Sequence, residues 1–411
     1  MRIAILCTAT TLHQQGGTEV HAETLAAGAA ARGHTVHVIT SSHPERPALE
    51  VNGGVSTHYL PGTDFSMPRK ALPAWWRQSS LKIRELAAGP GLDIIWAENF
   101  TGQYYASKLR NEVKVPVISF INGLGVLDDL KSYFSRISTP REILYFATSY
   151  LAQAALHLWP WQARTARYSD HIVAISRAAR NAIRRETSVP GDRITAVYPP
   201  VDTRLFRPDR ALREKARKAL GLAAGDRVLL MAGVIHKQKG FEIGLKAFLE
   251  LKASVPRLKM LIAGDGPERG RLESIAASRG EKSVIFAGAR PNREMPDIYN
   301  AADIYLNPTI RREGLAIVTV EAMACALPSV VTKTGGTAET IEDGISGFFT
   351  APGSSADIAR KTLEILGNAG LAVEMGTNAR KRAVAVFDAD KTIEAVLEIS
   401  EKVIKGAESK A

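Results

Sequence analysis

Cysteine is nearly absent from this sequence. Cys7 and Cys325 are the only two in 411 residues, and they stand neither in the close pairs of a zinc site nor in a redox spacing. This scarcity argues against a disulfide framework and a zinc site, and it is typical of proteins from a reducing compartment. The apolar run of residues 1–7 is too short for a secretory signal and predicts a first strand. We therefore expect a cytoplasmic protein.

The chain also lacks a concentrated block of positive charge, although its formal net charge is +11. Basic residues are spread over both halves, with a local excess in residues 131–193. No aromatic-basic RNA motif and no zinc-finger spacing accompany that excess. We expect no nucleic-acid partner.

Long uncharged apolar runs are missing, with one exception. Residues 143–163 carry no formally charged side chain, but Thr148, Gln153 and His157 interrupt the run, which favours a buried or interfacial helix over a membrane span. The segment carries tyrosines and tryptophans between flanking arginines, and residues 69–77 place a tryptophan pair among basic residues. Aromatic side chains beside cations suit the boundary of lipid headgroups. Both segments therefore predict contact with an anionic membrane surface.

Strand-like and helix-like segments alternate along the whole chain. Short β-branched, apolar runs such as RIAILC and RVLLMAG are separated by helical patterns in both halves. This alternation predicts an α/β fold with parallel, doubly wound sheets. The stiff stretch of residues 198–202, with two prolines, separates the halves. We expect two Rossmann-like domains, residues 1–200 and residues 201–387, facing a cleft lined by the carboxyl ends of both sheets.

The most informative segment, residues 311–328, follows a predicted strand, begins as a loop and continues as a helix. A helix that starts there presents free backbone N–H groups and a positive dipole end, which suit a diphosphate. Glu313 and Glu321 would lie ~12 Å apart along a helix axis, too far for the paired carboxylates of glycoside hydrolysis. Glu321 also interrupts an apolar run, where an unpaired carboxylate is costly. We expect each glutamate to bind hydroxyls, one set on a sugar and one on a ribose.

This segment and several others resemble the retaining glycosyltransferase family 4, whose fold is called GT-B. The resemblance covers nearly the whole chain, and its specificity comes from the order of motifs that are weak one by one. Those motifs are GGTE at 16–19, VDTRLFRP at 201–208, HKQKG at 236–240, AGDGP at 263–267, Glu313 and Glu321 with seven residues between them, and TGGTAETIEDG at 334–344.

The resemblance implies a nucleotide-sugar donor held by the C-terminal half. Glu321 would hold the ribose hydroxyls, Glu313 the donor sugar and Lys239 the diphosphate. Gly17, which lacks a Cβ, would let the first loop approach the phosphates. The rest of the expected donor site is the stretch Gly314, Leu315 and Ala316.

The resemblance also implies retaining, metal-independent hexosyl transfer without a protein nucleophile or a cofactor, in which the leaving phosphate helps to deprotonate the acceptor. Residues 388–411 would pack back on the N-terminal domain. That domain is the acceptor side in this family. Together with the aromatic and basic segments, this predicts a lipid-linked glycan or glycolipid as acceptor, in cell-envelope polysaccharide synthesis. The protein would be peripheral on the inner face of the membrane.

Two positions depart from the family pattern. Val234 stands where an arginine commonly binds the diphosphate, and Asn122 stands where a histidine is common. Asn122 can still hydrogen-bond a sugar hydroxyl, so it is expected at the reacting centre with Glu313 and Lys239. His13, His21 and His236 are interpreted as packed or surface side chains.

Three other functions remain open from the sequence. An NAD-dependent oxidoreductase requires G-x-G-x-x-G with an acidic residue about twenty positions later, and the first loop, TTLHQQGGTE, lacks that spacing. A nucleotide-sugar epimerase would need acid and base carboxylates across the cleft. A catalytically weak nucleotide-sugar-binding protein is suggested by Val234 and Asn122.

Overall fold

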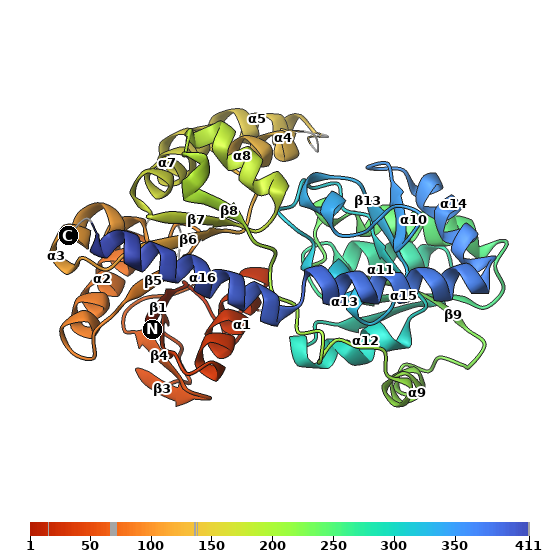
Figure 1. Cartoon of the computed structure of the whole chain (residues 1–411). Helices are drawn as coiled ribbons and strands as arrows, with labels where there is room; N and C mark the ends of the chain where they lie inside the picture. Colours follow the sequence, from red (N-terminus) through yellow and green to blue (C-terminus); the bar gives the residue numbers. More distant parts are fainter. Residues whose placement is uncertain (15, 66–71, 135–136, 138, 410–411) are drawn as a thin grey trace. The chain divides into compact units, whose positions relative to one another are not determined.

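The computed structural model describes residues 1–14, 16–65, 72–134, 137 and 139–409 and consists of two compact units. Unit 1 comprises Met1–Pro200 and Ala389–Ala411, and unit 2 comprises Val201–Asp388. Each unit contains one sheet of largely parallel strands, with helices packed on it (Figure 1). The fold class predicted from the sequence, two Rossmann-like α/β domains, is confirmed.

The sheet of unit 1 has the strand order β3-β4-β2-β1-β5-β6-β7-β8. All neighbours pair in parallel except β3, which runs antiparallel to β4. The order reverses between β1 and β5, which is the switch point of a doubly wound sheet. The strands are β1 (Arg2–Leu6), β2 (Thr35–Ser41), β3 (Leu49–Asn52), β4 (Val55–Leu60), β5 (Ile94–Glu98), β6 (Val117–Ile121), β7 (His171–Ala174) and β8 (Ile194–Ala196).

Helices cover both faces of this sheet. Ile3 and Ile5 share a core with α1 and α16, whereas the alternate residues Ala4 and Leu6 share one with α2. Figure 1 shows α16, the last helix, lying against α1. The helical segments are α1 (Gly17–Ala31), α2 (Leu72–Ala88), η1 (Tyr105–Leu109), α3 (Arg110–Val113), α4 (Val126–Phe134), α5 (Pro140–Tyr145), η2 (Phe146–Tyr150), α6 (Leu151–Gln153), η3 (Ala154–Leu158), α7 (Trp159–Tyr168), α8 (Arg177–Thr187), η4 (Gly191–Arg193) and α16 (Ala389–Glu408).

Unit 2 has a sheet of six parallel strands in the order β11-β10-β9-β12-β13-β14, with its switch point between β9 and β12. Its strands are β9 (Arg227–Ala232), β10 (Leu258–Ala263), β11 (Val284–Gly288), β12 (Ile304–Asn307), β13 (Ser329–Thr332) and β14 (Gly347–Thr350). Its helical segments are α9 (Arg210–Ala219), η5 (Lys237–Lys239), α10 (Phe241–Lys252), α11 (Arg269–Ser278), η6 (Asn292–Glu294), α12 (Met295–Ala301), α13 (Ile317–Ala324), η7 (Gly335–Glu339), α14 (Ser355–Leu366) and α15 (Ala369–Val386).

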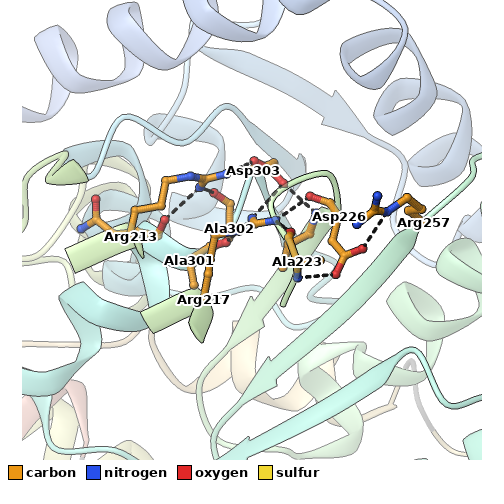
Figure 2. Close-up of polar contacts among 10 residues, drawn as sticks. Arg213, Arg217, Ala223, Asp226, Arg257, Ala301, Ala302 and Asp303 are labelled. Atoms are coloured by element: carbon orange, nitrogen blue, oxygen red, sulfur yellow. Dashed lines mark hydrogen bonds and ion pairs between the residues drawn. The ribbon is translucent and has the colours of Figure 1, made fainter. Parts of the chain in front are cut away.

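A polar network fastens α9 to the amino ends of β9 and β12 (Figure 2). Arg213 lies 2.6 Å from a carboxylate oxygen of Asp303, and the other oxygen accepts the N–H of Val228 at 2.7 Å. Arg217 is buried and donates to the carbonyl oxygens of Ala301 and Asp226. Because these bonds gather at the amino ends of the strands, they hold the sheet from the end opposite to the one where ligands bind in such folds.

The uncharged segment 143–163 is helical throughout, because α5, η2, α6, η3 and α7 follow one another without a break. Thr139 and Glu142 form a capping box at its start. Leu144 and Leu156 are 63% and 70% exposed, so large apolar side chains of this segment are open to solvent. Within the part of the chain that the structure describes, no helix is both long and apolar enough to cross a bilayer.

The prediction that residues 69–77 contact a membrane is wrong for the tryptophan pair of this segment. Trp75 and Trp76 are both buried on α2. They belong to the core between α2 and the sheet, where the large apolar area of an indole is removed from water. Residues 69–71 lie outside the described residues.

Candidate functional site

The candidate site of unit 2 lies at the carboxyl ends of β9 and β12. The strand order makes these two strands neighbours, although 71 residues separate Gln238 from Thr309 in the loops that follow them. The two loops are joined because the N–H of Ile310 and the hydroxyl of Thr309 both donate to the carbonyl oxygen of Gln238, at 3.0 and 3.2 Å. Ligands of doubly wound sheets bind at this kind of switch point.

Gly240 allows the first loop to turn into α10. Its φ of +71° is in the left-handed region, and a Cβ at this position would collide with the carbonyl oxygen of Pro308. Only glycine therefore fits both the conformation and the space. The turn fixes Lys239 at the end of η5, directly before α10.

Lys239 and Glu313 form an ion pair across the two loops. The Lys239 ammonium lies 2.9 Å from Oε1 of Glu313, and the side chains are 31% and 9% exposed. The hydroxyl of Thr309 donates to the same oxygen at 2.8 Å. The backbone oxygen of Glu313 accepts the N–H of Gly336 at 2.7 Å, which holds the loop in place. The carboxylate is buried and compensated, while the ammonium remains accessible to an anion.

The loop continues through Gly314, Leu315 and Ala316, all of which are buried, into α13. Ala316 is the residue before the helix, and no side chain caps it. The first backbone N–H groups of a helix have no partner within the helix, and its dipole favours negative charge at this end. The start of α13, which lies close to Glu313 in the sequence, therefore suits a phosphate group.

Glu321 lies in the second turn of α13 and is almost fully buried. Asn292 donates to its Oε1 at 2.9 Å, and the hydroxyl of Tyr299 donates to its Oε2 at 2.7 Å. Burial raises the pKa of Glu321 above its ordinary value, while the two hydrogen bonds act in the opposite direction. Burial also raises the pKa of Tyr299 well above its ordinary value, so the phenol stays protonated and able to donate.

Val234 is 50% exposed in the loop after β9. Its side chain can provide no charge–charge or hydrogen-bond contact to a phosphate. Arg311 and Arg312 precede Glu313 in the neighbouring loop, and the backbone N–H of Arg311 donates to the carbonyl oxygen of Gln238.

In unit 1, Asn122 follows β6 and takes part in a buried network. Its side-chain amide donates to Oε2 of Glu98 at 2.6 Å, and its backbone N–H donates to Oδ1 of Asn99 at 3.1 Å. Nδ1 of His21 lies 2.7 Å from the other oxygen of Glu98. Glu98 and His21 are both nearly inaccessible to solvent. A buried carboxylate is thus held at the switch point between β1 and β5.

Gly17 is the first residue of α1 and is exposed. The loop before it is fixed by Glu23, whose carboxylate accepts the N–H and the hydroxyl of Thr11 at 2.8 Å. Gly17 and Asn122 thus belong to unit 1, whereas Lys239, Glu313, Gly314, Leu315, Ala316 and Glu321 belong to unit 2. In the described parts of both units, no group of three or more His, Cys, Asp or Glu side chains is arranged to hold a metal ion.

Two known family profiles match this chain, one for each unit. The profile described as "Glycosyl transferases group 1" matches residues 213–382, and the profile described as "Glycosyltransferase Family 4" matches residues 15–205. The chain belongs to glycosyltransferase family 4. The resemblance stated from the sequence motifs is therefore confirmed.

Individual members of this group are similar to the chain over most of its length. D-inositol 3-phosphate glycosyltransferase of Saccharomonospora viridis is 27% identical over 421 residues, which cover 97% of this chain and 93% of the relative. Sucrose-phosphate synthase of Thermosynechococcus elongatus has a similar fold, with a TM-score of 0.82, 21% identity and coverage of 98% and 99%. Anabaena HepE, solved in complex with UDP-glucose, has a TM-score of 0.75, 20% identity and coverage of 98% and 100%.

Sequence reasoning missed several residues of this glycosyltransferase. Tyr299 and Asn292 are 22 and 29 residues before Glu321, on α12 and η6, and nothing in their own segments indicates that they contact it. Glu98 was not considered as a site residue, although a signal was present. It is an acidic residue at the last position of an apolar strand, where a buried carboxylate needs a partner.

Proposed function

We propose that this chain is a retaining, metal-independent glycosyltransferase that transfers a hexosyl group from a nucleotide sugar to a lipid-linked glycan or glycolipid. The observation that carries the donor assignment is the Lys239–Glu313 ion pair at the switch point of unit 2. It puts an accessible cation and a buried hydroxyl acceptor at one place, in the loops that lead into α10 and α13. A nucleotide sugar requires this combination, because its diphosphate is anionic and its hexose carries hydroxyls.

In this proposal each side chain has a separate part. Lys239 and the start of α13 bind the diphosphate and stabilise the charge that develops on it as the glycosidic bond breaks. Glu313 accepts hydrogen bonds from the hexose, and Glu321, held by Tyr299, accepts them from the ribose. No protein nucleophile takes part. The leaving phosphate helps to remove the acceptor proton, and the protein contributes positioning and charge stabilisation.

The donor class is supported by HepE, whose structure contains UDP-glucose. A thermal-shift panel of UDP, GDP, ADP and dTDP sugars tests it, since a ligand that binds only the folded protein stabilises it. We expect one nucleotide series to raise Tm and Glu321→Gln to reduce the shift. Glu374→Gln, an exposed position of α15, is the matched control. If no nucleotide sugar raises Tm, the proposed donor site is wrong.

The proposed membrane location and lipid-linked acceptor have a separate support in unit 1. The exposed apolar side chains of the segment from α5 to α7, Leu144 and Leu156 among them, are accompanied by Arg141, Arg164 and Arg167 in the same run of helix. Apolar side chains beside cations suit the interface of an anionic bilayer. On this proposal the enzyme acts at the inner, cytoplasmic face of the membrane in cell-envelope polysaccharide synthesis.

Vesicle flotation tests this location. The protein should float with phosphatidylglycerol vesicles at low salt and less at high salt, because the attraction between cations and headgroups is screened. The double variant Leu144→Ser, Leu156→Ser should float less. Val373→Ser changes an equally exposed residue, 71% accessible, in unit 2 and should float like the unchanged protein. Protein that stays in solution at low salt contradicts the membrane proposal but leaves the donor site untouched.

The exposed Val234 favours a second candidate, a nucleotide-sugar-binding protein of low catalytic power. A side chain without charge lowers the stabilisation of the leaving diphosphate. Donor hydrolysis and transfer to a membrane extract separate the two candidates. Tight donor binding without either reaction would support the binding protein.

A further inference from the structure

Unit 1 contains a cavity of about 150 Å³ at the carboxyl ends of β1 and β5. Its lining includes the residues directly after β1, the end of β5 and the start of α1, and α2 and α7 contribute one tryptophan each. We call it the unit 1 cavity. It lies entirely within one unit and at the switch point of its sheet, where such folds bind ligands.

One part of the lining is aromatic. Trp76 and Trp161 meet edge to face, with ring centroids 5.4 Å apart, and Phe100 lies beside Trp161 at 6.3 Å. The indole N–H of Trp76 is buried and has no hydrogen-bond partner among the residues that the structure describes. An unsatisfied buried donor is unfavourable.

The other part of the lining is acidic. Glu98 is held by His21 and Asn122, and Glu19 accepts a hydrogen bond from Gln14 at 2.7 Å. Both carboxylates are buried and line the cavity. Burial raises the pKa of Glu19, and the negative charge of Glu98 adds to this effect. Each carboxylate has lone pairs beyond those used within the protein.

Among the described residues that line the cavity there is no lysine or arginine. A phosphate or carboxylate placed there would face two acidic side chains and find no cation to pair with. Such an arrangement is strongly unfavourable at low dielectric constant. A hydroxyl or an ammonium group, by contrast, would donate to those carboxylates.

We propose that the unit 1 cavity binds a sugar ring of the acceptor that carries hydroxyl or amino groups and no anionic group. The inference rests on the proposed glycosyl transfer and names the class of acceptor that the transfer uses. The ring packs against Trp76 and Trp161 through its C–H faces, as apolar and aromatic pocket walls commonly hold ligands. Its hydroxyl or ammonium groups donate to Glu98 and Glu19. In a lipid-linked glycan, this ring is the terminal sugar, and the diphosphate of the lipid lies outside the cavity.

Three monosaccharides that share one ring and differ in charge test the proposal: methyl glucoside, glucosamine and glucuronic acid. Binding to the full-length protein is measured by saturation-transfer NMR and by tryptophan fluorescence, at a pH where the amine is protonated. We expect methyl glucoside and glucosamine to bind and glucuronic acid to bind at least about tenfold more weakly. Glu98→Gln should weaken glucosamine about tenfold, since it removes a charged acceptor. Glu45→Gln, an exposed position of unit 1, is the control and should change nothing.

Trp161→Phe gives an independent test, because it keeps an aromatic ring at a partly exposed position and does not depend on a buried charge. It should weaken all binding sugars to a similar degree while circular dichroism remains unchanged. The proposal would be overturned if glucuronic acid bound as tightly as glucosamine, or if none of the three sugars bound. The donor thermal-shift panel on the same preparation distinguishes the two failures. A Tm shift with a nucleotide sugar leaves the glycosyltransferase assignment standing when the cavity proposal falls.

Discussion

Tyr299→Phe removes a single oxygen atom, and its consequences follow from the position of Glu321. The lost hydroxyl donates to Oε2 of Glu321 at 2.7 Å, and Asn292 is the other side chain bonded to that carboxylate. A hydrogen bond to a charged group contributes about 1.5–3 kcal/mol. Unit 2 falls in the size range where 1 kcal/mol shifts Tm by about 2–4 °C. We therefore expect its Tm to fall by roughly 3–12 °C.

The assay compares thermal unfolding and nucleotide affinity for Tyr299→Phe and Tyr105→Phe. Tyr105 is equally buried, but its hydroxyl bonds only neutral groups: it donates to the carbonyl oxygen of Val115 at 3.1 Å and accepts the N–H of Val115 at 3.2 Å. Its removal should therefore cost about 1–3 kcal/mol for two neutral bonds, without any effect on Glu321. Tyr299→Phe should also weaken nucleotide binding, because the carboxylate proposed for the ribose loses its orientation. If the two variants lose equal stability and bind nucleotide equally well, Tyr299 does not position Glu321.

Three further outcomes are expected. Because the pKa of Glu321 is raised, its protonated form is favoured in the folded state. The free energy of unfolding of the unchanged protein should therefore fall as pH rises from the ordinary pKa of 4.5 through the folded pKa. In denaturant titrations over the same pH range, Glu321→Gln should gain stability relative to the unchanged protein. Lys239→Met should reduce donor affinity at least about tenfold and destabilise unit 2 by about 1–3 kcal/mol, since Glu313 loses its cation. Unchanged donor affinity in titration calorimetry would contradict the proposed contact between Lys239 and the diphosphate. Gly240→Ala should destabilise unit 2 by about 1–3 kcal/mol in urea unfolding, whereas Gly270→Ala, in open space on α11, should be neutral or stabilising.

The parts of the fold that the sequence predicted are those with strong local signals. Helix α10 lies between strands of the second half, where the sequence pattern predicts helices, and Asp209 caps the start of α9. The strands β3 and β4 were not predicted. Leu49 and Val51 on β3 are exposed, so this edge hairpin shows no buried apolar face for a pattern to reveal. The short strands β8 and β14 were missed for lack of length.

In the candidate site, too, the residues with a local sequence signal were predicted and those without one were not. Glu321 was predicted because it is an acidic side chain in an apolar run, and Glu313 because it stands in the loop before the same helix and matches the family motif. Their partners could not be predicted, because Thr309, Tyr299 and Asn292 reach them only through packing between loops and helices. The tryptophan pair of α2 was assigned to a membrane surface since sequence alone does not tell which face of an amphipathic helix is buried.

The buried carboxylates of the two units have different partners, and this difference underlies the proposed division between donor and acceptor. Each unit holds a glutamate at or just after the carboxyl end of a strand beside its switch point. Glu313 is paired with the ammonium of Lys239, which can also attract a diphosphate. Glu98 is bonded to an amide and an imidazole and lies with Glu19 in the same cavity lining, where a diphosphate would be repelled. On the two proposals made above, a nucleotide sugar binds unit 2 and a neutral or amino sugar binds unit 1, and the charge next to each carboxylate is the physical reason for this division.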